Sequence, residues 1–90
     1  MKVIKIGALW CPDCLIMKPR WAEIEKENAW LETEYIDYDD EEEKAKSLMG
    51  EIKEIPVFVF FDKDNKVLER LQGVVSKDIL LKKINEYKEK

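Results

Sequence analysis

Histidine is absent from this 90-residue sequence, and cysteine occurs only twice, at Cys11 and Cys14. Without histidine or a third cysteine, a zinc site within one chain would need carboxylate ligands, so a metal role would depend on a dimer or an iron–sulfur cluster. The two cysteines are three positions apart and cannot link distant parts of the chain. Such a local pair indicates chemistry rather than scaffolding, and we predict no metal.

Long apolar runs are also missing. The longest, Pro56 to Phe61, is far short of the roughly 20 residues that span a bilayer and is typical of a strand. The N-terminal residues MKVIKIGALWC lack the apolar segment and the small-residue cleavage site of a secretory signal. We therefore expect a cytoplasmic protein with no membrane association.

Neither sign of charge dominates the composition. Sixteen basic and twenty acidic residues give a formal net charge of -4, which argues against non-specific binding to nucleic acid. The chain is long enough for one compact domain and too short for two, so we expect residues 1–90 to form a single, monomeric domain.

The order of patterns along the chain is βαβαββα. Short runs of β-formers predict four strands, whereas three- and four-residue apolar spacing predicts three helices. The expected strands are 2–8, 33–38, 55–61 and 66–71; the expected helices begin at Pro12, after Asp39 and Asp40 as candidate caps, and after the cap Ser76. Pro19, inside the first helix, predicts a kink.

The cysteine pair opens the first helix directly after a strand. Pro12 suits the first helical position, which makes Cys11 the N-cap residue, where unpaired N–H groups and the helix dipole favour its thiolate. We expect an exposed Cys11 to attack a substrate disulfide, and Cys14, pointing towards the core, to attack Cys11 and release the product. The carboxylate of Asp13 should oppose the helix by disfavouring a nearby thiolate.

With these residues the sequence resembles the thioredoxin superfamily over nearly its whole length. The matching features are Trp10 to Cys14 (Trp-Cys-Pro-Asp-Cys), Pro19, Ile55-Pro56 and Gly73 before the last helix. The resemblance implies an α/β, thioredoxin-like fold of minimal βαβαββα form, with a four-stranded mixed sheet flanked by helices. It also implies no cofactor beyond a redox-active Cys11–Cys14 disulfide.

The resemblance further implies how substrate is bound. Pro56 would be cis and pack against the cysteines, and the backbone of Ile55 would pair with an extended client segment. An ordinary trans proline that begins a strand is the alternative. Trp10 would shield the nucleophile. Trp10 and Gly73 would both contribute to the substrate surface. The implied partners are disulfide-containing client proteins and a flavin-dependent or ferredoxin-dependent reductase of thioredoxin-reductase type.

Two features depart from the family pattern. The usual first strand and helix are absent, and Lys5 occupies the strand position where thioredoxins commonly carry a buried acid. We expect Lys5 to tune the site, either partly buried and paired with Glu32 or Glu34, or extended to solvent.

The leading interpretation is a thiol-disulfide oxidoreductase that reduces protein disulfides. One alternative is a glutaredoxin-type enzyme that uses glutathione, although residues 73–76 lack the paired glycines and following acid that hold glutathione. The other is a redox-inactive or metal-binding adaptor that keeps the fold, which two intact cysteines at a helix start disfavour.

Overall fold

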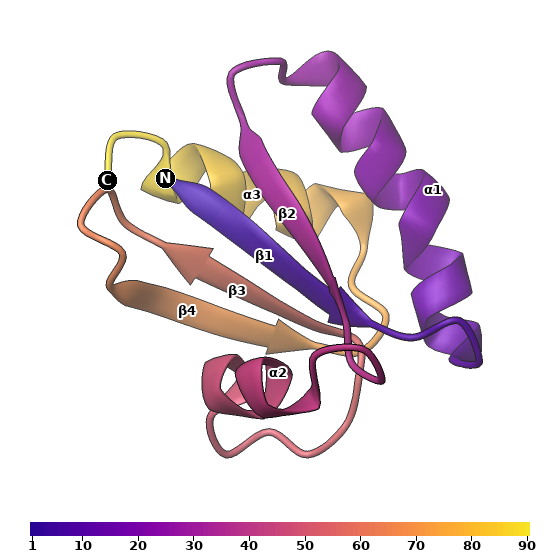
Figure 1. The fold of residues 1–90 in the computed structure, drawn as a ribbon. Helices are drawn as coiled ribbons and strands as arrows, with labels where there is room; N and C mark the ends of the chain where they lie inside the picture. The colour runs from indigo at the N-terminus through magenta and orange to yellow at the C-terminus, as the bar shows by residue number, and fades with distance from the viewer.

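A computed structural model describes all residues of the chain, 1–90 (Figure 1). Four strands and three helices follow one another in the predicted order βαβαββα. Their bounds are β1 Lys2–Gly7, α1 Pro12–Glu27, β2 Glu32–Asp37, α2 Glu42–Met49, β3 Val57–Phe61, β4 Val67–Gln72 and α3 Lys77–Tyr87. None of the three helices is long and apolar enough to cross a membrane.

The strands form one mixed sheet in the order β2-β1-β3-β4. β1 and β2 are parallel and are joined through α1, whereas β3 is antiparallel to both β1 and β4. Helices α1 and α3 cover one face of the sheet and α2 covers the other (Figure 1). The fold is therefore the expected α/β, thioredoxin-like one.

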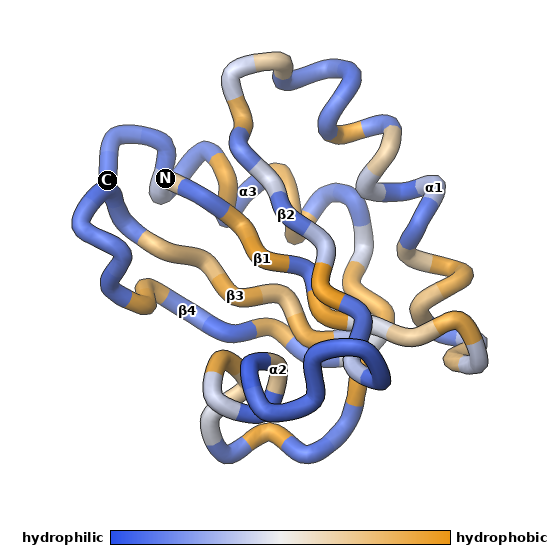
Figure 2. Tube along the Cα trace, viewed as in Figure 1, coloured by the Kyte–Doolittle hydropathy of each residue, from blue (hydrophilic) through white to orange (hydrophobic).

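Side chains of the central strands alternate between two cores. From β3, Phe58 and Phe60 pack with α1 and α3, whereas Val57, Val59 and Phe61 pack with α2. All five residues of β3 are buried because both faces are covered, and the strand is continuously apolar in Figure 2. Strand β3 is therefore packed against helices on both faces of the sheet.

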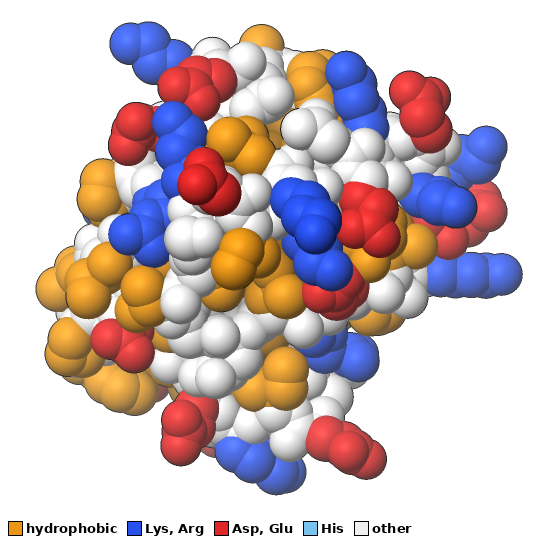
Figure 3. Space-filling model, turned by 180° about the vertical axis from the view of Figure 1, so that it is seen from behind, with side chains coloured by type: hydrophobic (Ala, Val, Ile, Leu, Met, Phe, Trp, Pro, Cys, Tyr) orange, Lys and Arg blue, Asp and Glu red, His pale blue; other side chains and the backbone are white.

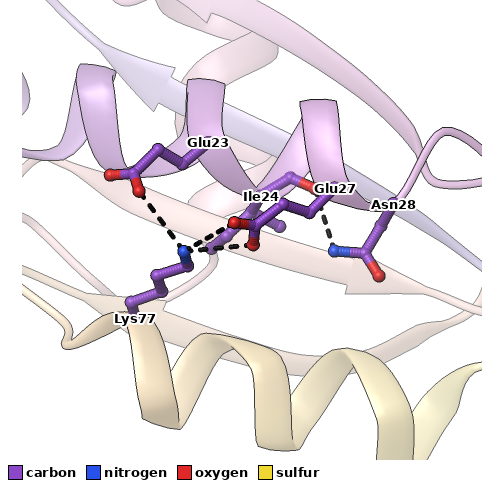
Figure 4. Close-up of polar contacts among 5 residues, drawn as sticks. All are labelled: Glu23, Ile24, Glu27, Asn28 and Lys77. Atoms are coloured by element: carbon purple, nitrogen blue, oxygen red, sulfur yellow. Dashed lines mark hydrogen bonds and ion pairs between the residues drawn. The ribbon is translucent and has the colours of Figure 1, made fainter.

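The two helices on the same face are also joined by charge. Lys77 at the start of α3 bonds Glu23 at 3.3 Å and Glu27 at 3.0 Å, both on α1 (Figure 4). In the same region the Asn28 side chain donates to the Ile24 carbonyl at 2.9 Å, at the end of α1 (Figure 4). These pairs are largely solvent-exposed, so they fix orientation more than they stabilise.

The predicted capping residues Cys11 of α1 and Ser76 of α3 are correct, whereas those predicted for α2 are wrong. Ser76 caps α3 by accepting from the Ile79 N–H at 3.2 Å. Asp39 and Asp40 do not cap α2, which begins after Glu41 without a side-chain cap. Their own N–H groups instead donate to the side chain of Asp37, so they form a turn that ends β2.

Candidate functional site

Cys11 is the N-cap residue of α1, as the sequence predicts. Its backbone is extended (φ -89°, ψ 112°), and its Sγ accepts a hydrogen bond from the Cys14 N–H at 3.2 Å. Pro12 takes the first helical position, and both cysteines are free thiols. One sulfur therefore lies directly in front of unpaired N–H groups at the positive end of a helix.

The exposure of the two thiols is the reverse of the expectation. Cys11 is 4% exposed, whereas Cys14 is half-buried. Cys11 is covered because the loop before β3 lies against it, and its thiol donates to the Ile55 carbonyl at 3.9 Å. The first thiol is thus held against a backbone segment rather than open to solvent.

That segment contains a cis peptide bond between Ile55 and Pro56. Pro56 is buried, and its carbonyl accepts from the Gly73 N–H at 2.9 Å. Gly73 has φ 83°, a left-handed conformation that favours glycine. The N–H of Ile55 forms no hydrogen bond and its carbonyl accepts only from the Cys11 thiol, so this backbone edge lies beside Cys11 without a strand partner.

Trp10, directly before Cys11 in the sequence, is 63% exposed. Its indole Nε1–H donates to the Asp39 carboxylate at 2.7 Å. Sequence reasoning assigned Asp39 to a helix cap and missed this contact, which no local pattern indicates because 29 positions separate the two residues. Pro12 and Asp13 are exposed in the first turn of α1.

The pKa of the Cys14 thiol is raised to about 12, and burial is the largest cause. Its contact with Cys11 and the charges of Cys11 and Asp13 act in the same direction, while a hydrogen bond to the Ala8 backbone acts in the opposite direction. Cys14 is therefore a protonated thiol at neutral pH.

Lys5 pairs with neither Glu32 nor Glu34, which corrects that expectation. In the β1/β2 register Glu34 lies opposite Ile4, and both therefore face the α2 side of the sheet. Lys5 points to the opposite side, where its ammonium group forms an ion pair with Glu25 of α1. Sequence reasoning missed Glu25 because the parallel register was unknown.

The Lys5–Glu25 pair is partly buried rather than extended into solvent. The Lys5 side chain is 19% exposed and that of Glu25 33%. The Thr33 hydroxyl also donates to Glu25 at 3.0 Å, and the ammonium lies 5.9 Å from the centre of the Trp21 ring. Each charge thus has partners that offset the cost of its burial.

Each thiol borders its own hollow. A hollow of about 490 Å³ lies beside Cys11 and is bounded by Trp10, Asp13, Tyr38 and Ile55. A second hollow, of about 420 Å³, lies beside Cys14; we call it the Cys14 cavity. It is lined mainly by apolar residues, and among its lining residues are Gly7, Leu15, Trp21, Ala22, Tyr35 and the Lys5–Glu25 pair.

The fold, the capped dithiol and the adjoining cis-proline loop define a thioredoxin-fold redox protein. A sequence model of the family described as Thioredoxin matches residues 1–75, and the chain belongs to this family. No curated protein gives a significant sequence match.

Solved thioredoxin structures have the same fold. Thioredoxin NaTrxh from Nicotiana alata has a TM-score of 0.84 and 28% identity, over 94% of this chain and 70% of that one. The thioredoxin of Fasciola hepatica has a TM-score of 0.82 and 29% identity, over 94% and 78%. Oxidised mitochondrial thioredoxin 3 from Saccharomyces cerevisiae has a TM-score of 0.80 and 26% identity, over 93% and 76%.

Proposed function

We propose that this protein reduces disulfide bonds in other proteins. The Cys11 thiolate attacks a client disulfide, forms a mixed disulfide and expels one client thiolate. Cys14 loses its proton and attacks Cys11, which releases the second client thiolate and leaves the Cys11–Cys14 disulfide. The client gains two electrons and the protein loses two.

One observation carries this proposal: the Cys11 sulfur accepts the Cys14 N–H at 3.2 Å at the N-cap of α1. This position supports negative charge on Cys11, because the helix end and the hydrogen bond both favour the anion. Three-residue spacing across the first turn also keeps Cys14 within reach for the second step.

The client would lie across Trp10, Ile55 and Gly73. The backbone of Ile55 has no strand partner and can bond an extended client strand, which recognises backbone rather than a particular sequence. Trp10 adds an exposed apolar surface that its bond to Asp39 holds in place. Leu9 before α1 and Leu15 and Ile16 in its first turns are also exposed. Apolar side chains gather at the lower left edge of the view in Figure 3.

A reductase of thioredoxin-reductase type is the proposed electron donor, and no contact in the site favours glutathione over it. We assign Asp13 and Lys5 to tuning of the two thiols. Asp13 adds a negative charge that acts on Cys14, and Lys5 lies with Glu25 on the wall of the Cys14 cavity.

Insulin precipitation tests the proposal. With dithiothreitol as reductant, catalytic amounts of the protein should shorten the delay before reduced insulin precipitates, in proportion to protein concentration. The matched control is the protein alkylated at both cysteines, which keeps the chain but removes the thiols. Precipitation no faster than with dithiothreitol alone would refute protein-disulfide reduction.

A further inference from the structure

The two sulfurs of the site face different surroundings. The hollow beside Cys11 does not include Cys14, and the Cys14 cavity does not include Cys11. Gly7 leaves room at Cys14: a Cβ at this position would lie 3.1 Å from the Cys14 Sγ and 3.4 Å from the Tyr35 ring. A small molecule in the Cys14 cavity can therefore approach Cys14 without contacting Cys11.

The two sulfurs also differ as leaving groups in an oxidised protein. A thiolate displaced at Cys11 is received by the Cys14 N–H and the helix end. A thiolate displaced at Cys14 forms beside a mainly apolar wall, and burial raises the pKa of that thiol to about 12. Because a thiolate that is hydrogen-bonded as it forms is the better leaving group, attack on Cys14, which displaces Cys11, is the more favourable direction of reduction.

The lining of the Cys14 cavity specifies the attacking molecule. Its volume of about 420 Å³ suits a small molecule rather than a folded protein, and its walls include Leu15, Met17, Trp21 and Phe58. Three charged residues line the cavity: Lys5 and Glu25 form an ion pair, whereas the exposed Lys18 forms none. The mainly apolar wall favours a small aliphatic thiol over a larger, polar one.

We propose that small aliphatic dithiols reduce the oxidised protein through the Cys14 cavity, by attacking Cys14; this rests on the proposed disulfide cycle. The attacking thiolate forms a bond to the Cys14 Sγ, the Cys11–Cys14 bond breaks, and its electron pair leaves on Cys11. The second thiol, as its thiolate, then attacks the first sulfur of the dithiol, and Cys14 leaves and takes a proton. The dithiol becomes a cyclic disulfide, and two electrons pass to the protein. Clients then use Cys11, which borders the other hollow.

The site of attack can be mapped directly with 1-butanethiol, which cannot complete the second step. Oxidised protein is mixed with it, quenched in acid within milliseconds and treated with a thiol-blocking reagent at acid pH. Cleavage before Asp13 then separates Cys11 from Cys14 for mass analysis. At the earliest times we expect butanethiol on Cys14 and the blocking group on Cys11. The reverse distribution would overturn the proposal.

A cavity-filling variant tests the route. Ala22 is an exposed residue of α1 that lines the Cys14 cavity, so Ala22→Phe should lower the rate of reduction by 1,4-butanedithiol at least tenfold. Lys26→Phe, one turn later and outside the cavity, is the matched control and should leave this rate unchanged. Gly7→Ala, which narrows the space at the sulfur itself, should also slow reduction. Folding of each variant is checked by circular dichroism.

A second dithiol and the rate of insulin reduction show whether the effect of Ala22→Phe is confined to the Cys14 cavity. Dithiothreitol, which adds two hydroxyl groups to butanedithiol, should lose less rate in Ala22→Phe because it gains less from an apolar cavity. Insulin reduction by the pre-reduced variant should stay within twofold of the unmodified protein. An unchanged butanedithiol rate in folded Ala22→Phe would overturn the Cys14 route, whereas failure of insulin reduction by the unmodified protein would refute the proposed function instead.

Discussion

Replacing Cys11 with serine, Cys11→Ser, should lower the catalysed rate of insulin reduction on the order of 10³-fold or more, to the rate of the reductant alone. The reason is that a serine hydroxyl is not ionised at neutral pH and cannot form the first mixed disulfide, although Pro12 and the helix end remain. The rate is measured by turbidity with purified, folded variants at matched concentration.

Cys14→Ser, the same chemical change one helical turn away, is the matched control and should behave differently. It keeps the attacking thiol, so one equivalent of client should become bound to Cys11 and stay bound. A non-reducing gel shows this adduct, and a reductant removes it. Full turnover by Cys11→Ser, or a client adduct that maps to Cys14 in the unmodified protein, would contradict the assigned roles.

The release of client should accelerate about tenfold per pH unit, or about 100-fold between pH 7 and pH 9. Burial is the main cause that raises the pKa of Cys14 to about 12, and burial persists when Cys11 is bound to a client. Cys14 is therefore almost fully protonated in this range, and its reactive thiolate fraction rises tenfold for each pH unit.

Single-turnover kinetics separate this step from the first one. The Cys14→Ser variant gives the rate of mixed-disulfide formation at each pH, and the unmodified protein gives formation followed by release. The slope of the release rate alone is then compared with the expected value. A release rate that levels off below pH 8 would show that Cys14 ionises far more easily than its burial implies.

Local patterns predicted the elements of this fold well. Pro12 after Cys11 gave the start of α1, Ser76 gave the cap of α3, and the apolar run ending at Phe61 gave β3. These features depend on residues within one or two helical turns or on one strand. Short-range rules of capping and periodicity are sufficient for them.

Contacts between distant elements were not predicted from the residues. The partner of Lys5 depends on the parallel register of β1 and β2, which turns Glu34 to the opposite face and leaves Glu25 of α1 within reach. The bond from Trp10 to Asp39 likewise depends on where the turn after β2 lies. Neither register nor turn position is encoded in a local pattern.

The burial of Cys11 has the same origin. A residue at the tip of a helix is expected to be exposed when the helix is considered alone. Here the loop at Ile55 and Pro56, more than 40 positions away in the sequence, covers it. The same loop supplies the backbone edge at Ile55 that has no strand partner, so one loop both covers the thiol and forms the proposed client surface.

The most direct test of the division of labour between the two thiols is their rate of alkylation in the folded, reduced protein at pH 7. Iodoacetamide is applied for increasing times, and the two residues are separated by cleavage before Asp13. We predict that Cys11 is carboxamidomethylated at least about 100-fold faster than Cys14, because only the thiolate reacts and only Cys11 lies at the helix end. Equal rates at the two cysteines, or faster labelling of Cys14, would contradict the account.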